Sequence, residues 1–256
     1  MKKTISSLRA VLITIKNKKT IMKVGLMIMA ITTMITMNAC SKIDNETAND
    51  VCAALAEKYG EDFVAVKIGD RFNTDHAKLY IYPINNESLL FTATINKDTK
   101  LVEDDYIIQR VNNIVDNTIA GELKKQELTG YANCCVVTRE PIQTDIVYET
   151  PKAFQEEYKF ENFLIYLCVS ENNLNAKRLY DTIKNSVSEL GVTVRYRVYV
   201  FKESDYKNCV EKIKTMPDAN ATAIEKFTPI KNFWVDVNND DISLSEEYID
   251  NILQEG

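Results

Sequence analysis

Glycine is scarce in this sequence, and its seven residues are widely spaced. No two glycines lie closer than nine positions apart, and neither G-x-G-x-x-G nor G-x-x-x-x-G-K-[ST] occurs. A loop that cradles phosphate needs clustered glycines, because backbone N–H groups must approach the anion closely. The sequence therefore argues against nucleotide binding of the P-loop or Rossmann type.

Histidine is rarer still, since His76 is the single one. Zinc sites built from histidines and diiron motifs need two or more, so both are excluded. A Ser-His-Asp or Cys-His catalytic site would have to use His76. This residue ends a polar segment, Asn73-Thr74-Asp75-His76, that leads into a strand-like run. We interpret it as a turn residue rather than as a catalytic base.

Cysteine spacing gives no metal or redox motif, because no C-x-x-C occurs. Cys134 and Cys135 are adjacent in a predicted strand, so their side chains point to opposite faces and cannot share one metal ion. We interpret the cysteines after residue 40 as small buried hydrophobic residues. The alternative is a redox pair or a disulfide between neighbouring strands, from Cys134 or Cys135 to Cys168.

Acidic residues are absent from the first 40 positions, which hold seven Lys or Arg. The whole chain carries −6, and subtracting the +7 of residues 1 to 40 leaves −13 for residues 41 to 256. A net charge this negative argues against nucleic acid as a partner, because binding to phosphates requires a basic surface. It also argues against broad adhesion to anionic lipid headgroups. We interpret the acidity as a source of solubility.

The main hydrophobic run is shorter than a membrane-spanning helix. Val24 to Met37 is a stretch of fourteen uncharged residues that follows Lys18, Lys19 and Lys23. A spanning helix needs about 20 apolar residues to cross roughly 30 Å of hydrocarbon. Fourteen residues after a basic segment are typical of the hydrophobic part of a signal peptide.

The end of this run resembles the signal peptides of bacterial lipoproteins, which place a small residue before an invariant cysteine. Ala39 and Cys40 match that pattern, whereas Met37 and Asn38 replace its usual leucine and small residue. The resemblance covers about residues 22 to 41. It implies that residues 1 to 39 are a signal peptide and that Cys40 is lipidated.

Lipidation of Cys40 would, by the same resemblance, attach diacylglycerol through a thioether and allow acylation of the new amino terminus. Each buried methylene contributes about 0.8 kcal/mol, so two acyl chains anchor a protein stably. The alternatives are an uncleaved anchor helix and a plain secretory signal.

Residues 40 to 49 are polar and are predicted to be a tether, and residues 50 to 128 a first α+β module. Asp50 to Tyr59 has helical spacing and ends at Gly60. Asp104 or Asp105 can cap a long helix whose apolar stripe runs from Ile107 to Ile119. Between the helices lie three strand-like runs: Phe63–Ile68, Lys78–Ile84 and Leu89–Ile95. The order α-β-β-β-α predicts an antiparallel sheet packed on helices.

Residues 129 to 256 are predicted to be a second α/β module with a mixed sheet. Its β-α-β-α order implies a parallel pair of strands joined by a crossover helix. The predicted elements are strands Ala132–Thr138, Phe163–Val169 and Val192–Phe201, and helices near Lys152–Tyr158, Leu174–Leu190 and Asp205–Lys214.

Two arginines of the last predicted strand, Arg195 and Arg197, share a face with Tyr199. They could receive a carboxylate or an acidic partner. Pairing with Asp or Glu of the same acidic chain is the simpler interpretation.

One C-terminal segment resembles the calcium loop of EF-hand and dockerin proteins. Asp236, Asn238, Asp240 and Glu247 occupy positions 1, 3, 5 and 12 of such a loop, where oxygen atoms can wrap one ion. Position 6 lacks the usual glycine, and position 8 lacks the usual branched apolar residue. The alternative is a helix start, in which Ser243-Leu-Ser-Glu246 forms a capping box.

These observations predict a non-catalytic, lipid-anchored protein at the extracytoplasmic side of the cell membrane, which binds a protein or peptide of the envelope. No cofactor is expected. The alternative is a lipid-anchored enzyme or a metal- or solute-binding protein, because a Ser-Lys or paired-carboxylate site leaves no local signature. A deep pocket with converging carboxylates would favour the alternative, and a flat apolar patch the binding protein.

Overall fold

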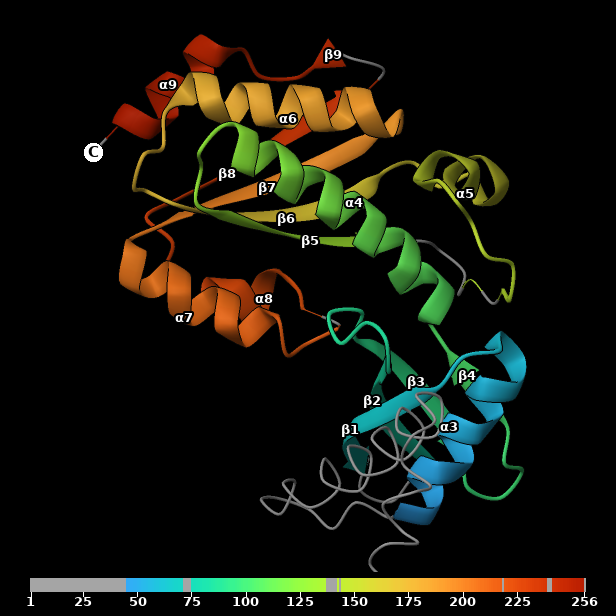
Figure 1. Cartoon of the computed structure of the whole chain (residues 1–256). Helices are drawn as coiled ribbons and strands as arrows, with labels where there is room; N and C mark the ends of the chain where they lie inside the picture. Colours follow the sequence, from blue (N-terminus) through green and yellow to red (C-terminus); the bar gives the residue numbers. More distant parts are fainter. Residues whose placement is uncertain are drawn as a thin grey trace, which may run out of the picture. The chain divides into compact units, whose positions relative to one another are not determined.

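The structure is a computed structural model. It describes residues 45–70, 75–136, 142, 144–217, 219–238 and 241–255. Figure 1 shows the order of the elements along the chain. The architecture is α+β, with an antiparallel four-stranded sheet followed by a mixed five-stranded sheet and helices, as the sequence predicts.

The first sheet has the strand order β1-β2-β3-β4, and each strand runs antiparallel to its neighbours. The predicted helices and three main strands are confirmed, and the three-residue β4 is an addition. The elements are α3 (Asn45–Tyr59), β1 (Phe63–Asp70), β2 (His76–Pro83), β3 (Phe91–Asn96), β4 (Val102–Asp104) and α4 (Tyr106–Lys125).

Helix α3 begins at Asn45, five residues before the predicted start. Thr47 and Ala48 lie on its buried face, beside Val51 and Leu55. The prediction of a tether over residues 40 to 49 is therefore wrong for its second half, because these small residues pack rather than extend. Residues 40 to 44 and Cys40 itself lie outside the described part of the chain.

The core of the first module rests on alternation and on aromatic packing. Buried and half-buried residues alternate along β2 and β3, so every second side chain faces the helices. Phe63 and Phe91 pack edge-to-face, with ring centroids 5.6 Å apart. Tyr106, in the first turn of α4, lies 5.3 Å from Phe63 and 5.0 Å from Phe91. Helix α4 thereby fixes one end of this sheet.

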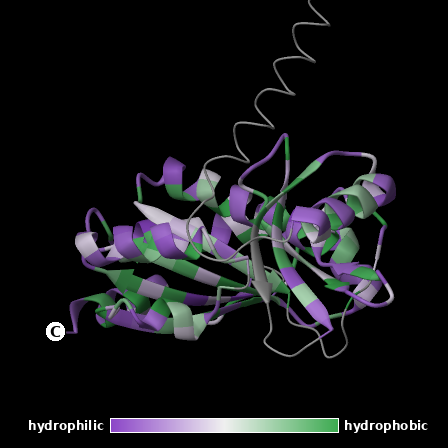
Figure 2. Cartoon of the chain, turned by 90° about the horizontal axis from the view of Figure 1, so that it is seen from below, coloured by the Kyte–Doolittle hydropathy of each residue, from purple (hydrophilic) through white to green (hydrophobic). Residues whose placement is uncertain are grey.

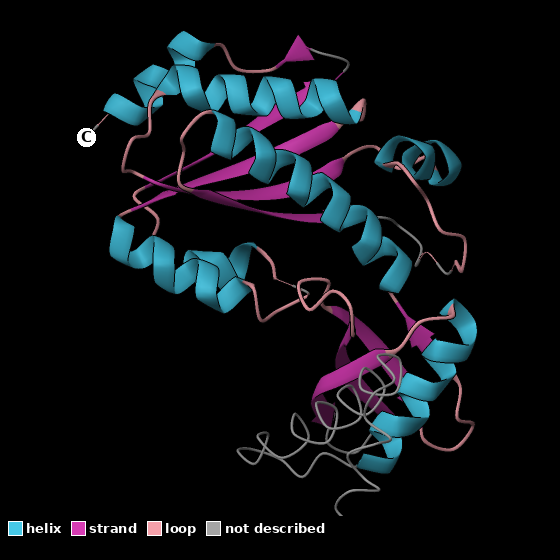
Figure 3. Cartoon of the chain, viewed as in Figure 1, coloured by secondary structure: helices cyan, strands magenta, loops and turns pink. Residues whose placement is uncertain are grey.

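The second sheet has the order β5-β6-β7-β8-β9, and only β6 and β7 are parallel. Helix α6 is their crossover, as predicted, and Figure 3 shows the strands between the helices. The elements are β5 (Gly130–Val136), α5 (Pro151–Tyr158), β6 (Phe163–Ser170), α6 (Ala176–Leu190), β7 (Val194–Phe201), α7 (Glu203–Ile213), α8 (Ala221–Glu225), β8 (Lys231–Asn238), β9 (Asp241–Ile242) and α9 (Glu246–Gln254).

Both ends of α6 follow from its sequence. The side chain of Asn175 accepts a hydrogen bond from the backbone N–H of Arg178 at 2.9 Å and caps the first turn. Gly191 ends the helix with φ = +63°, a conformation that favours glycine. The predicted stop at Gly191 is confirmed.

Helices cover the five-stranded sheet on both sides (Figure 1). Helices α4, α6 and α9 pack on one face, where they bury the even-numbered residues Val194 to Val200 of β7. Helices α7 and α8 pack on part of the other face, against Cys168, Tyr199 and Phe201. Figure 2 shows apolar residues concentrated in the strands and on helix faces. On β7, Arg195, Arg197 and Tyr199 share the face opposite the even-numbered residues, as predicted.

Candidate functional site

The residues predicted to hold calcium lie in different settings. Asp236 is in β8 and forms an ion pair with Arg195, with 2.5 Å between Oδ1 and Nε. Asn238 pairs with Asp241 across the β8–β9 hairpin. Glu247 lies in the first turn of α9 and lines a surface hollow beside Lys177 of α6. Asp240 is outside the described residues.

Within the described residues, no three His, Cys, Asp or Glu side chains lie close enough to hold a metal ion. Calcium binding by the whole loop stays a prediction. The alternative, a helix start, is confirmed by α9, but the predicted capping box that begins at Ser243 is wrong. Ser245 caps α9, accepting from the backbone N–H of Tyr248 at 3.2 Å. Ser243 is used elsewhere, because its Oγ accepts from the backbone N–H of Asp236 at 2.9 Å.

His76 begins strand β2 and is exposed, with its Nε2 3.4 Å from the side-chain amide of Asn96. The structure therefore places His76 in a strand and not in a turn, and residues 71 to 74 before it lie outside the described part of the chain.

The five described cysteines are free thiols: Cys52, Cys134, Cys135, Cys168 and Cys209. Cys134 packs in the core beneath α4, and Cys135 packs against the opposite core, so the prediction of opposite faces is confirmed. Burial raises the pKa of the Cys134 thiol, and also raises the pKa of Cys135 to about 12. Neither thiol is therefore an activated nucleophile.

Thiol titration of the denatured, unreduced protein should therefore give five reactive thiols from residues 41 to 256. Burial raises the pKa of Cys52, Cys134 and Cys135, which disfavours their thiolates and slows their oxidation in the folded state. The hydrogen bond with Cys168 instead lowers the pKa of Cys209. Cys168 and Cys209 form a thiol–thiol hydrogen bond, so they are the pair best placed for a disulfide. A count of three, with a peptide that links Cys168 to Cys209, would contradict the expectation.

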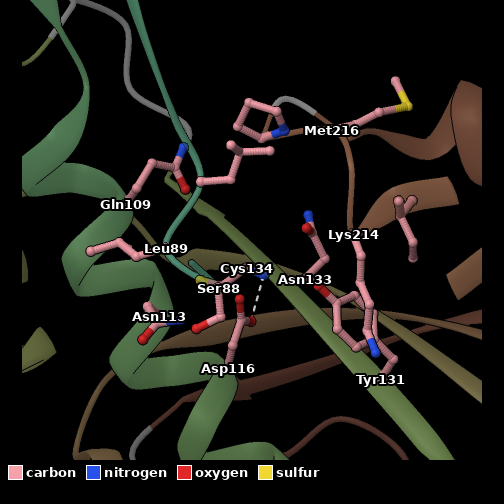
Figure 4. A pocket seen from close by; sticks show the side chains of 13 residues that line it. Ser88, Leu89, Gln109, Asn113, Asp116, Tyr131, Asn133, Cys134, Lys214 and Met216 are labelled. Carbon is pink, nitrogen blue, oxygen red and sulfur yellow. Dashed lines mark hydrogen bonds between the residues drawn. The ribbon is translucent and has the colours of Figure 1, made fainter. Parts of the chain in front are cut away.

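A small polar pocket lies beside helix α4 and strand β5, within the compact unit formed by residues 44 to 256. Its volume is about 50 Å³. Figure 4 shows the side chains around it, which come from four segments of the chain. The polar ones include Ser88, Gln109, Asn113, Asp116, Asn133 and Lys214.

Asp116 is the carboxyl group of this pocket, and its environment perturbs it strongly. Its Oδ1 accepts a hydrogen bond from the backbone N–H of Cys134 at 2.7 Å (Figure 4). Burial raises the pKa of the Asp116 carboxyl well above its ordinary value, and this hydrogen bond only partly opposes the rise. The carboxyl group satisfies a backbone donor of the edge strand β5. The pocket is roughly large enough for one water molecule, whose share of liquid volume is about 30 Å³.

The second candidate is a surface on the sheet face that carries α7 and α8. Strand register places Leu164, Arg195 and Asp236 in one row across β6, β7 and β8, and Arg197 and Trp234 in the next. We call these five residues the Trp234 surface. Leu164 is half-buried, while Arg195 and Asp236 are exposed. Helices α7 and α8 cover the rows beyond, through contacts with Cys168 and Tyr199.

Arg197 organises the Trp234 surface. Its guanidinium lies 5.0 Å from the ring centroid of Trp234 and 5.2 Å from that of Tyr199. Its NH2 donates to Glu225 of α8 at 2.6 Å. Its Nε is buried and has no hydrogen-bond partner among the described residues. Trp234 is nevertheless 44% exposed, so one side of its ring is held while the other meets solvent.

Both arginine pairs confirm the predicted intramolecular pairing with acids. The hydrogen bond and charge of Asp236 raise the pKa of Arg195. Trp234 itself was not predicted as a site residue. The alternation Asn232, Trp234, Asp236 against Phe233, Val235, Val237 was the signal, and the calcium-loop pattern that begins at Asp236 obscured it.

Comparison with known proteins shows similarity of fold. No family model and no curated protein matches the chain. The crystal structure of a DUF5037 family protein from Ruminococcus gnavus is similar, with a TM-score of 0.64 and 14% sequence identity. The similarity covers 82% of this chain and 99% of that one. At this identity the likeness concerns the fold alone.

None of the described helices is both long and apolar enough to span a bilayer.

Proposed function

We propose that this protein is a lipid-anchored extracytoplasmic protein that binds another protein or a peptide, and that Cys40 holds it at the membrane. The Trp234 surface is the observation that carries the binding role. A few residues contribute most of the binding energy at protein interfaces, and tryptophan and arginine are enriched among them in well-packed positions. Arg197 holds Trp234 in this way before any partner arrives.

The size of the polar pocket argues against a small-molecule site at Asp116, and the larger hollow beside Lys177 and Glu247, about 530 Å³, is open to solvent. Ligand pockets usually measure about 300 to 1,000 Å³ and bury most of the ligand. The pocket at Asp116 measures about 50 Å³. Its one strongly perturbed carboxyl already serves the backbone of Cys134.

Membrane attachment is tested by replacing Cys40 with alanine. Wild-type protein is expected in the membrane fraction and labelled by radioactive palmitate, because two acyl chains bind a bilayer stably. The C40A variant should lose the label and most of its membrane retention. Cys52→Ala, at a half-buried thiol of α3, is the matched control and should keep both. Equal labelling of C40A would contradict the anchor.

Partner binding is tested by chemical crosslinking on intact cells, followed by purification of the detergent-solubilised protein. W234A should reduce the crosslinked partner about thirtyfold or more, which corresponds to a hot spot of about 2 kcal/mol. Tyr248→Ala is the control, because Tyr248 is 54% exposed but lies on α9. No partner with wild type, or equal loss in both variants, would count against the proposal.

A further inference from the structure

The outer edge of β8 has a stretch without a partner strand. On this side, β9 pairs only with Val237 and Asn238. Asp236 is also occupied, since its carbonyl accepts from the N–H of Ser243 at 2.9 Å and its N–H donates to the Ser243 hydroxyl. Over residues 231 to 235, no described strand adds to β8 beyond β7.

The direction of the backbone groups on this stretch follows from Asp236. In an antiparallel ladder, alternate residues direct both N–H and C=O to the same side. Because Asp236 directs its groups outward to Ser243, Trp234 and Asn232 must do the same. Two N–H donors and two C=O acceptors therefore line the edge. At the other end, the N–H of Ile230 donates inward to Val200 at 2.8 Å.

The other sheet edges in the described residues are protected against pairing with another chain, whereas the unpaired stretch of β8 is not. Edge strands are usually blunted by bulges, short length or covering groups, since unpaired edges attract other chains. On β5, the Asp116 carboxyl group accepts a hydrogen bond from the N–H of Cys134. On β1, a bulge interrupts the register between Ala65 and Lys67. Strand β4 is three residues long.

We propose that an extended segment of the partner protein adds to β8 as a further strand, pairing with the backbone of Asn232 and Trp234. The inference rests on the proposed function and supplies its binding mode. Strand addition gives affinity through main-chain hydrogen bonds and specificity through alternate side chains. Side chains of the added strand on the Trp234 side lie next to an exposed indole, so the segment carries an apolar or aromatic residue there.

The length of the unpaired stretch of β8 favours a short linear peptide as the added strand. Five residues of strand span about 17 Å. Ser243 and β9 close one end of the stretch, and the inward bond of Ile230 marks the other. A peptide of about five residues fits between these limits.

The test is a linear peptide library displayed on phage and selected against the detergent-solubilised full-length protein. Asn232→Pro removes one outward N–H at an edge position where proline is tolerated. Its matched control, Asn232→Ala, keeps that N–H and removes only the side chain. We expect N232P to weaken selected peptides about tenfold and N232A to leave them within about threefold.

Hydrogen exchange gives a second readout that does not depend on a variant's folding. In the peptide complex, the amides of Asn232 and Trp234 should exchange at least about tenfold more slowly than in the free protein. Unprotected amides, equal binding by N232P and N232A, or no enriched peptide overturns strand addition. If the protein self-associates and N232P abolishes that self-association, a second copy of the chain occupies the edge. This result would also overturn strand addition by a partner.

The experiments distinguish a failure of the proposed function from a failure of strand addition. If W234A loses the crosslinked partner while the amides of Asn232 and Trp234 stay unprotected, the partner binds the sheet face instead of the edge.

Discussion

Tyr196→Ala is expected to lower the free energy of unfolding by about 3 to 5 kcal/mol, the usual loss for deleting a large buried aromatic ring. Tyr196 lies in β7, the middle strand of the five-stranded sheet, and is 0% exposed. Its ring packs in the core beneath α4 and α6. Its truncation leaves a cavity among side chains that are fixed by regular structure and can collapse only partly.

Tyr196→Phe separates the ring from its hydroxyl group. The Tyr196 hydroxyl lies 2.8 Å from Ser186 Oγ, which also bonds the carbonyl of Thr182 at 2.8 Å. The phenylalanine variant keeps the packing and loses one hydrogen bond, so we expect a loss of about 1 kcal/mol. Urea denaturation followed by circular dichroism measures both values. Similar losses for the two variants would show that the hydroxyl, and not the ring, matters at this position.

Asp116→Ala should destabilise the protein by about 1 to 3 kcal/mol at neutral pH, because it leaves the N–H of Cys134 without its acceptor. Asp116→Asn keeps a side-chain oxygen and removes the ionisable group. We therefore expect the asparagine variant to match or exceed wild type at neutral pH.

The pH dependence has a definite sign. Burial raises the pKa of Asp116 in the folded state, so the folded protein holds its proton to higher pH than the unfolded chain. This contribution to stability is fully present below the unfolded pKa and is lost as pH rises through the folded one. The difference in stability between wild type and D116N should fall across that window. A difference that is constant from pH 4 to 8, or that rises with pH, would contradict the assignment.

Most of the fold could be predicted from long periodic segments. The apolar alternation of Val192–Phe201 and the helical stripe of α6 are strong signals, and Gly191 marks the boundary between them. Three short elements were missed: β4, α8 and β9. Elements of two to five residues are too short to show a period, and tertiary contacts define them. Strand β8 was missed although it alternates, since its end overlaps the predicted calcium loop.

The sites were harder to predict because their partners are distant in sequence. Asp116 bonds Cys134 from 18 positions away, and Arg197 bonds Glu225 from 28. Charge balance alone predicted that the arginines pair within the chain, and this was correct. Which strand lies at an edge depends on the complete strand order, and a sequence pattern does not supply that order.

Helix α4 has a consequence for how the two cores lose their structure. Its first turn supplies Tyr106 to the aromatic cluster of the first sheet, and Val111 to Leu123 of the same helix belong to the core of the second. A helix whose hydrogen bonds run unbroken from one core to the other cannot fray at either end without weakening both. The two halves should therefore behave as one cooperative unit, in which damage to either lowers the melting temperature of the whole.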